Sequence, residues 1–256
     1  MIDTHTHLDH LENADDAVVA ARAAGVHGMI SIGCGAESIN ATLDIARRHE
    51  NCVRVAVGVH PLGAAEFDLK LFDQIAELAS DPLVVAIGET GFDQFHKKAG
   101  TLDQQQPAFA LQAELARTLN LPLIIHTRDA ERYTIDQLTE LCEGLTVVLH
   151  CFSLPDYLPE VIANDWYCSF AGNITYDSAD ALRKAISKIN DERVLVETDA
   201  PYLTPVPHRG EKNEPALVPH TLAVVASELG WSVEVADLIL TRNSVSAFGL
   251  PAEWNR

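Results

Sequence analysis

The sequence is poor in basic residues. Of its 256 residues, 18 are Lys or Arg and 37 are Asp or Glu, which gives a formal net charge of −19. This balance excludes an extended basic surface, the usual mark of a protein that wraps duplex nucleic acid. Any ligand that carries phosphate would need cations supplied locally, by a metal ion or by a few placed Lys and Arg side chains.

Long apolar runs and paired cysteines are also missing. No apolar stretch approaches the roughly 20 residues of a membrane span, so no membrane partner is expected. The five cysteines form no CxxC pair and predict reduced thiols instead of a disulfide framework. Because the first apolar run starts at Met1–Ile2, we expect no secretory leader. Together these features predict a cytoplasmic protein, as a monomer or a weak oligomer.

Linker-like and low-complexity segments are absent, so residues 1–256 are expected to fold as a single domain. Eight short, nearly continuous apolar runs are typical of buried parallel strands. They are MIDTHTH (1–7), HGMISIGC (27–34), VRVAVGVH (53–60), VVAIGETG (84–91), PLIIHTRD (122–129), TVVLHCF (146–152), WYCSFAGNI (166–174) and VLVETDA (194–200). Helical patterns between them predict an α/β fold, a (β/α)8 TIM barrel. An open doubly wound sheet is the alternative, although no GxGxxG motif follows the first run.

Two of the helical patterns carry signals for where the helix begins. In DQQQPAFALQAELARTLN (103–120), Pro107 predicts the start of the regular helix, because proline is tolerated in the first turn. In SADALRKAISKIN (178–190), Ser178 is placed as the N-cap before the apolar stripe.

Ionisable residues gather at the C-terminal ends of the predicted strands. In a TIM barrel these ends meet at one face, where active sites lie. In chain order the residues at these ends are His5, His7, His60, Glu89, His126, His150 and Asp199. In an extended strand Asp3, His5 and His7 would point to the same face. Glu89 and Asp199 lie within apolar runs, where an unpaired carboxylate is costly.

This set predicts a site for two divalent metal ions per chain. Six of these residues could act as ligands, which is more than one ion with an open position for water needs. Six ligands, with one carboxylate shared, suit two ions about 3.5–4 Å apart. The six predicted ligands are His5, His7, Glu89, His126, His150 and Asp199. The residues of strands one and eight would hold the first ion, since those strands are neighbours in a closed barrel. The histidines of strands five and six would hold the second ion, with Glu89 as the bridge.

In order and spacing, the motifs around these residues resemble the TatD family of metal-dependent hydrolases, within the amidohydrolase-like barrels. The matching stretches are DTHTHLD, GVHP, AIGETGFD, IIHTRDA, VLHCFS, ETDAPYL and, at 213–215, NEP. The resemblance implies a deoxyribonuclease that trims single-stranded DNA from the 3′ end, with DNA ends or short oligonucleotides as substrate. It places the metal ligands of the family on the same six residues.

The identity of the ions stays open among Mg, Mn and Zn. Mixed histidine and carboxylate ligands suit Zn, Mn, Fe or Ni better than Mg, which favours oxygen. The family, however, is usually described as working with magnesium.

Catalytic roles are predicted for two of the carboxylates. Asp199 would act as general base toward the attacking water, and Glu89 would hold the two ions together. Glu197 alternates to the other face of its strand and is predicted to be a structural ion-pair residue.

Several loop residues near the predicted barrel mouth are candidates for substrate contact. The predicted substrate-binding residues are His60, Arg128, Arg209 and Lys212. Phe92, Phe152 and Tyr202 are candidate surfaces for base stacking, although packing in the core or at the rim is the favoured interpretation for each residue taken alone. Leu154 replaces a glycine that is usual in the family, and Glu211–Lys212 replaces its basic pair. The loop QFHKKAG is less aromatic than usual, so these differences bear on the substrate range.

Two other functions fit the same scaffold. A lactonase, amidohydrolase or phosphotriesterase would act on a small molecule, but such enzymes often bridge their metals with a carboxylated lysine at the end of strand four. Glu89 stands at that place. A non-catalytic module that uses the metals for structure is the second alternative.

Overall fold

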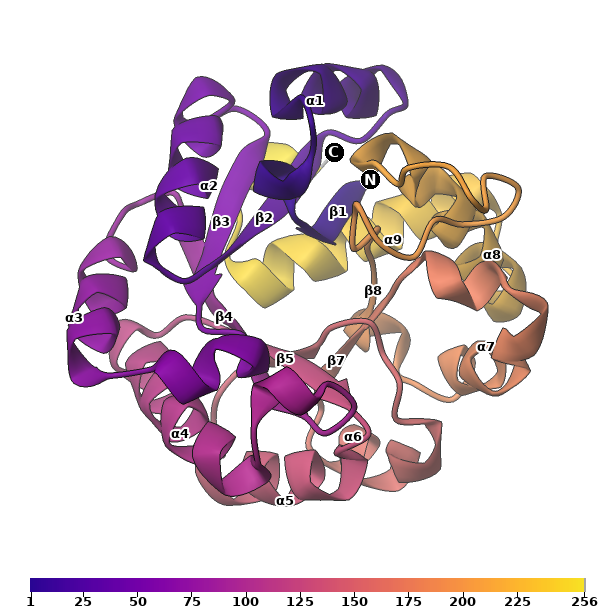
Figure 1. Cartoon of the computed structure of the whole chain (residues 1–256). Coiled ribbons are helices and arrows are strands. Elements are labelled where there is room, and N and C mark those ends of the chain that lie inside the picture. Colours follow the sequence, from indigo (N-terminus) through magenta and orange to yellow (C-terminus); the bar gives the residue numbers. More distant parts are fainter. Residues whose placement is uncertain (256) are drawn as a thin grey trace.

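A computed structural model of the chain describes residues 1–255, which form one parallel sheet of eight strands in the order β1 to β8 (Figure 1). The strands are β1 (Ile2–Thr6), β2 (Gly28–Cys34), β3 (Val53–Gly58), β4 (Val84–Asp93), β5 (Leu123–Arg128), β6 (Val147–Leu149), β7 (Tyr167–Phe170) and β8 (Val194–Val196). The helices are α1 (Ala14–Ala23), α2 (Ala36–Arg48), α3 (Leu69–Leu78), α4 (Leu102–Leu119), α5 (Glu131–Leu141), α6 (Leu158–Ala163), α7 (Asp180–Ile186), α8 (Val218–Leu229) and α9 (Val233–Phe248). The predicted (β/α)8 barrel is confirmed.

Two of the predicted helix starts are wrong. Helix α4 begins at Leu102, five residues before Pro107, because Thr101 and Gln104 form a capping box that secures the first turn. Pro107 then removes only the hydrogen bond to the carbonyl of residue 103 and stays inside the helix. Ser178 lies within a short 3-10 turn, Asp177–Ala179, and α7 starts only after it.

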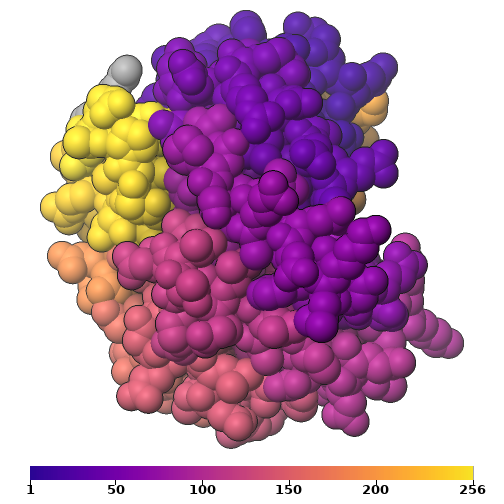
Figure 2. All heavy atoms as spheres, turned by 90° about the vertical axis from the view of Figure 1, so that its left-hand side faces the viewer, coloured from indigo at the N-terminus to yellow at the C-terminus, as the bar shows by residue number. Residues whose placement is uncertain are grey.

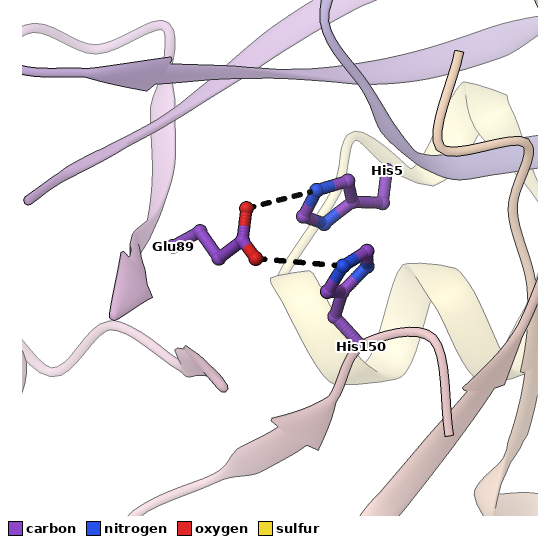
Figure 3. Close-up of side chains that lie close together, drawn as sticks. All are labelled: His5, Glu89 and His150. Carbon is purple, nitrogen blue, oxygen red and sulfur yellow. Dashed lines mark ion pairs between the residues drawn. The ribbon is translucent and has the colours of Figure 1, made fainter. Parts of the chain in front are cut away.

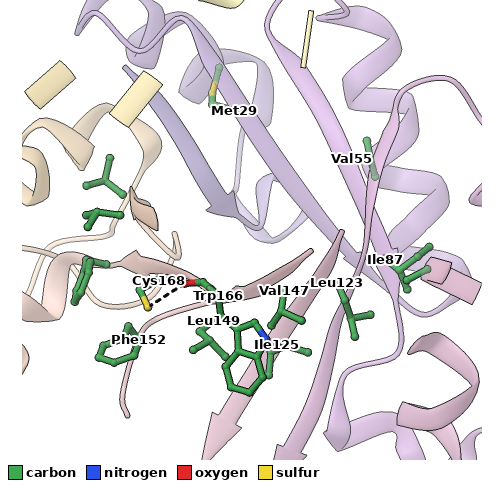
Figure 4. Packing of buried hydrophobic residues seen from close by; sticks show 14 of the residues in the cluster. Met29, Val55, Ile87, Leu123, Ile125, Val147, Leu149, Phe152, Trp166 and Cys168 are labelled. Atoms are coloured by element: carbon green, nitrogen blue, oxygen red, sulfur yellow. Dashed lines mark hydrogen bonds between the residues drawn. The ribbon is translucent and has the colours of Figure 1, made fainter. Parts of the chain in front are cut away.

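The apolar residues of the strands divide between two sides of the barrel wall. Met29, Val55 and Ile87 pack outward in the large cluster that the helices cover (Figure 4). Their sequence neighbours Ile30, Ala56 and Ala86 point into the barrel, where they join a second, smaller cluster. This alternation is the period-two pattern of strands that are buried on both faces.

The C-terminal segment covers one end of the barrel. Trp254 is 4% exposed and belongs to the inner cluster together with Ile2 and Phe248. The side view shows the yellow end of the chain packed against indigo and purple segments of the first third (Figure 2). This packing leaves the opposite end, where the strands finish, for the ligand-bearing loops.

None of the helices within residues 1–255 combines the length and the hydropathy that crossing a membrane requires. In the same part of the chain all five cysteines are free thiols.

The barrel closes between β1 and β8 through a few specific contacts. The backbone of Thr6 pairs with that of Ala200, and the amide of Asp199 donates to the carbonyl of His5 at 2.9 Å. The buried Asp3 adds a side-chain link, because its carboxylate accepts from the Thr198 amide at 2.9 Å and from the Thr198 hydroxyl at 2.6 Å. Burial raises the pKa of Asp3 to about 8, against these hydrogen bonds. Asp3 therefore faces β8 and fixes the seam beside His5.

We expect Asp3→Ala to lower the free energy of unfolding by about 1–3 kcal/mol, since it leaves the buried donors of Thr198 without an acceptor. Urea unfolding followed by circular dichroism measures the change. Asp73→Ala, on the exposed surface of α3, is the matched control and should change the stability little. Equal stabilities of the two variants would contradict the role of Asp3 in closing the barrel.

Candidate metal centre

Glu89 lies near the end of β4 and is 2% exposed. Its two carboxylate oxygens face different groups of histidines, and Figure 3 shows one oxygen directed at His5 and the other at His150. Glu89 Oε2 lies 3.4 Å from His5 Nε2 and 3.9 Å from His7 Nε2. Asp199 Oδ1 completes this side at 3.8 Å and 3.5 Å from the same two nitrogens. The three side chains proposed for the first ion therefore meet beside one oxygen of Glu89.

The other oxygen of Glu89 faces the histidines that follow later strands. Glu89 Oε1 lies 2.7 Å from His126 Nδ1, 3.5 Å from His150 Nε2 and 3.6 Å from His60 Nε2. His60, proposed from the sequence as a substrate contact, thus stands in one group with Glu89 and His126, within 4.8 Å of each other. His150 stacks on His5 at 3.6 Å between ring centroids and joins the two sides.

The donor set fits divalent cations. His5 is 1% exposed, and neither of its ring nitrogens has a hydrogen-bond partner among residues 1–255. A buried polar atom without a partner is costly, and a cation bound at Nε2 would supply the missing interaction. Histidine nitrogens and carboxylate oxygens at this spacing are suitable ligands for Zn or Mn.

The electrostatics of the centre favour ionised carboxylates. Burial acts to raise the pKa of Glu89, but the imidazoles of His150 and His60 hold it well below its usual range. The pKa of Asp199 is also lowered, by His7 and His150 against the effect of burial. Both carboxylates are therefore charged at neutral pH, the state that binds a cation.

The histidines fall into two classes. Burial lowers the pKa of His60 to about 4 and also lowers that of His5, so both are neutral and ready to bind metal. For His150, burial is outweighed by Glu197 and Glu89, which raise its pKa to about 10. A metal ion would have to displace that proton, so binding should release protons.

Two carboxylates that the sequence analysis did not assign to the centre orient its histidines. His126 Nε2 lies 3.1 Å from Asp93 Oδ2, and His150 Nδ1 lies 2.7 Å from Glu197 Oε1. Each imidazole therefore turns one nitrogen toward Glu89 and the other toward a buried carboxylate, an arrangement that fixes the ring and raises its basicity. Glu197 forms an ion pair as predicted, but its partner is a proposed ligand, so it positions the centre. Glu197 lies inside the apolar run 194–200, which was the available signal, whereas Asp93 lies two residues beyond the run 84–91.

Two buried glutamines of α4 hold the strand ends in place. Gln112 accepts from the Val59 amide at 2.7 Å and donates to Thr90 Oγ1 at 2.8 Å. Gln105 accepts from the Asp93 amide at 2.9 Å and donates to the Asp93 carbonyl at 2.8 Å. Through these contacts α4 supports the chain next to His60 and Glu89.

The three cationic residues proposed for substrate contact each have a partner within the chain: Arg128 and Arg209 lie over aromatic rings, and Lys212 forms an ion pair. The Arg128 guanidinium lies 4.0 Å from the centre of the Phe95 ring, and that of Arg209 lies 3.9 Å from the Tyr176 ring. Lys212, 83% exposed, pairs with Glu12 at 2.7 Å.

The aromatic residues proposed as stacking surfaces differ in their exposure to solvent. Phe92 and Phe152 are 0% and 1% exposed and pack in the core, which confirms the favoured interpretation and leaves neither ring open to a base. Tyr202 is 52% exposed and contacts His7 and His10 edge-on.

Comparison with known proteins extends over nearly the whole chain. A family model described as "TatD related DNase" matches residues 2–249. The chain is 36% identical to an "Uncharacterized metal-dependent hydrolase TatD" of Mycobacterium tuberculosis, over 98% of both chains. It is 33% identical to the "3′-5′ ssDNA/RNA exonuclease TatD" of Escherichia coli strain K12, covering 93% of this chain and 94% of the relative. A crystal structure of YJJV, a TatD homolog from Escherichia coli, superposes with a TM-score of 0.90 at 26% identity, over 98% of each chain.

We expect Glu89→Gln to lower the occupancy of both ions together, because its two oxygens face both ligand groups. Elemental analysis after dialysis should show about two metal equivalents per wild-type chain and far less than one in the variant. Glu192→Gln, at an exposed site before β8, should retain the wild-type content. A full equivalent retained by Glu89→Gln would show that one ion binds without the bridge.

Proposed function

Because the chain belongs to the TatD family of metal-dependent hydrolases, we propose that it removes nucleotides from the 3′ ends of single-stranded DNA by phosphodiester hydrolysis. The observation that carries the proposal is the placement of Glu89, with one oxygen toward His5 and His7 and the other toward His126 and His150. Such a paired site matches the demand of phosphodiester hydrolysis, in which both the attacking and the leaving oxygen need stabilisation. The relative named as an ssDNA/RNA exonuclease supports the substrate class and adds RNA to it.

The six proposed ligands would hold two divalent cations. They are His5, His7, Glu89, His126, His150 and Asp199. When bound, Mg, Mn or Zn ions lower the pKa of water and offset the charge of the phosphate.

Asp199 is the residue we assign as general base. Its side chain is 13% exposed, so it borders the space that a substrate phosphate would enter. Its lowered pKa keeps it ionised at neutral pH, ready to accept a proton from the attacking water. The backbone amide of Asp199 donates to the His5 carbonyl at 2.9 Å, which holds the carboxylate beside the first ligand group.

The charge of the chain limits how nucleic acid can bind. With a net charge of −19, the surface offers little general attraction to a polyanion. Arg128 and Arg209 can contact phosphate at the mouth, while Lys212 is paired with Glu12. We therefore propose that the enzyme engages short single-stranded ends, with a shallow dependence on salt.

The test is to incubate metal-loaded protein with end-labelled single- and double-stranded DNA and RNA and to map the products. We expect stepwise shortening from the 3′ end, fastest on single strands. Asp199→Asn should fold and lose hydrolysis by at least about 100-fold, in line with the loss of a general base. Hydrolysis by Asp199→Asn at the wild-type rate would remove the general-base assignment, and intact oligonucleotides with wild-type protein would contradict the proposed activity.

A further inference from the structure

Two exposed aromatic side chains have no role in the metal centre. Among the large hydrophobic side chains that are exposed within residues 1–255, only Phe95 and Tyr202 are aromatic, and they are 54% and 52% exposed. The others are aliphatic: Val19, Leu69, Ile162, Val206, Val233, Val235 and Leu238. An exposed aromatic ring offers a flat face on which a nucleobase can stack.

Both rings belong to loops at the mouth of the barrel. Phe95 follows the end of β4, and Tyr202 lies in the loop after β8. In a closed barrel with the strand order β1 to β8, β4 and β8 lie on opposite sides. The segments that follow these strands accordingly lie across the mouth from each other in Figure 1.

Each ring borders a different ligand group. The Tyr202 ring lies 6.0 Å from that of His7, on the side that faces Glu89 Oε2. The Phe95 ring lies 4.9 Å from that of His96, whose Nδ1 is 2.8 Å from Asp93 Oδ2. Asp93 in turn contacts His126, on the side that faces Glu89 Oε1. The two rings therefore bracket the place where the substrate phosphate would sit.

We propose that Phe95 and Tyr202 are stacking platforms for two nucleobases, one on each side of the scissile phosphate. This inference rests on the proposed function and adds how the strand is held. Arg128 lies 4.0 Å over one face of Phe95 and still leaves the ring half-exposed, so a base can stack on the remaining surface. The guanidinium of Arg128 also places a positive charge beside this ring, where it could contact a phosphate of the bound strand.

Stacking explains how an acidic protein can bind nucleic acid ends. Base–aromatic stacking needs no positive charge and tolerates every base, since each base has a π-face. The bases of a duplex are already stacked on each other, so platforms select single strands. An affinity that depends on rings instead of on basic patches is consistent with the net charge of −19.

The experiment measures binding of a fluorescein-labelled oligothymidylate by anisotropy, with Mn²⁺, in the Asp199→Asn background, where turnover is suppressed. A second oligonucleotide carries abasic sites at its two 3′-terminal positions. We expect Phe95→Leu and Tyr202→Leu each to raise the Kd for the first oligonucleotide about tenfold, the size of one lost base–aromatic stack. The Kd for the abasic oligonucleotide should change far less.

Matched variants separate stacking from other effects. Tyr202→Phe keeps the ring and should bind like the background, whereas Leu238→Ala removes an exposed apolar side chain from α9 and should have no effect. An equal loss of affinity for the normal and the abasic oligonucleotide, or an unchanged Kd in both leucine variants, would contradict the proposed stacking of bases on Phe95 and Tyr202. Because binding is measured apart from hydrolysis, this failure is distinct from a failure of the proposed exonuclease activity.

Discussion

One buried carboxylate sits within 4 Å of five imidazoles, and the functional end of the barrel is organised around it. The imidazoles around Glu89 belong to His5, His7, His60, His126 and His150. Burial alone would make a charged Glu89 costly, and the surrounding imidazoles reverse that effect. The same arrangement leaves several histidine nitrogens turned toward a common space, which divalent cations would satisfy. The contacts between Glu89 and these imidazoles thus both stabilise the buried charge and form the proposed metal site.

The barrel makes this arrangement possible, because segments far apart in the sequence reach one rim. The link between Asp3 and Thr198 closes β1 onto β8 and so brings His5 beside Asp199. On the other side, Gln105 and Gln112 of α4 tie down the chain around β4. Asp93 and Glu197 then orient the outer nitrogens of two histidines. Buried side chains thus fix the position of the ligands, whereas the exposed rings of Phe95 and Tyr202 lie outside this network at the mouth of the barrel.

Periodicity was sufficient to predict the barrel and the convergence of ionisable residues, because apolar runs that end in His, Glu or Asp mark strand ends. It could not show that Asp93 pairs with His126, since the two are separated by 33 residues and meet only through strand pairing. The start of α4 was missed because the local preference of Pro107 lost to the capping box at Thr101. The sequence also could not show which aromatic side chains are exposed: Phe92 is buried, whereas Phe95, three residues later, is open to solvent.

The central claim is that Glu89 lies between two divalent ions. Anomalous diffraction from crystals grown with Mn²⁺ tests it most directly. We expect two peaks about 3.5–4 Å apart, one beside His5, His7 and Asp199 and the other beside His126 and His150, each in contact with one oxygen of Glu89. A single peak, or two peaks of which only one contacts Glu89, would contradict it.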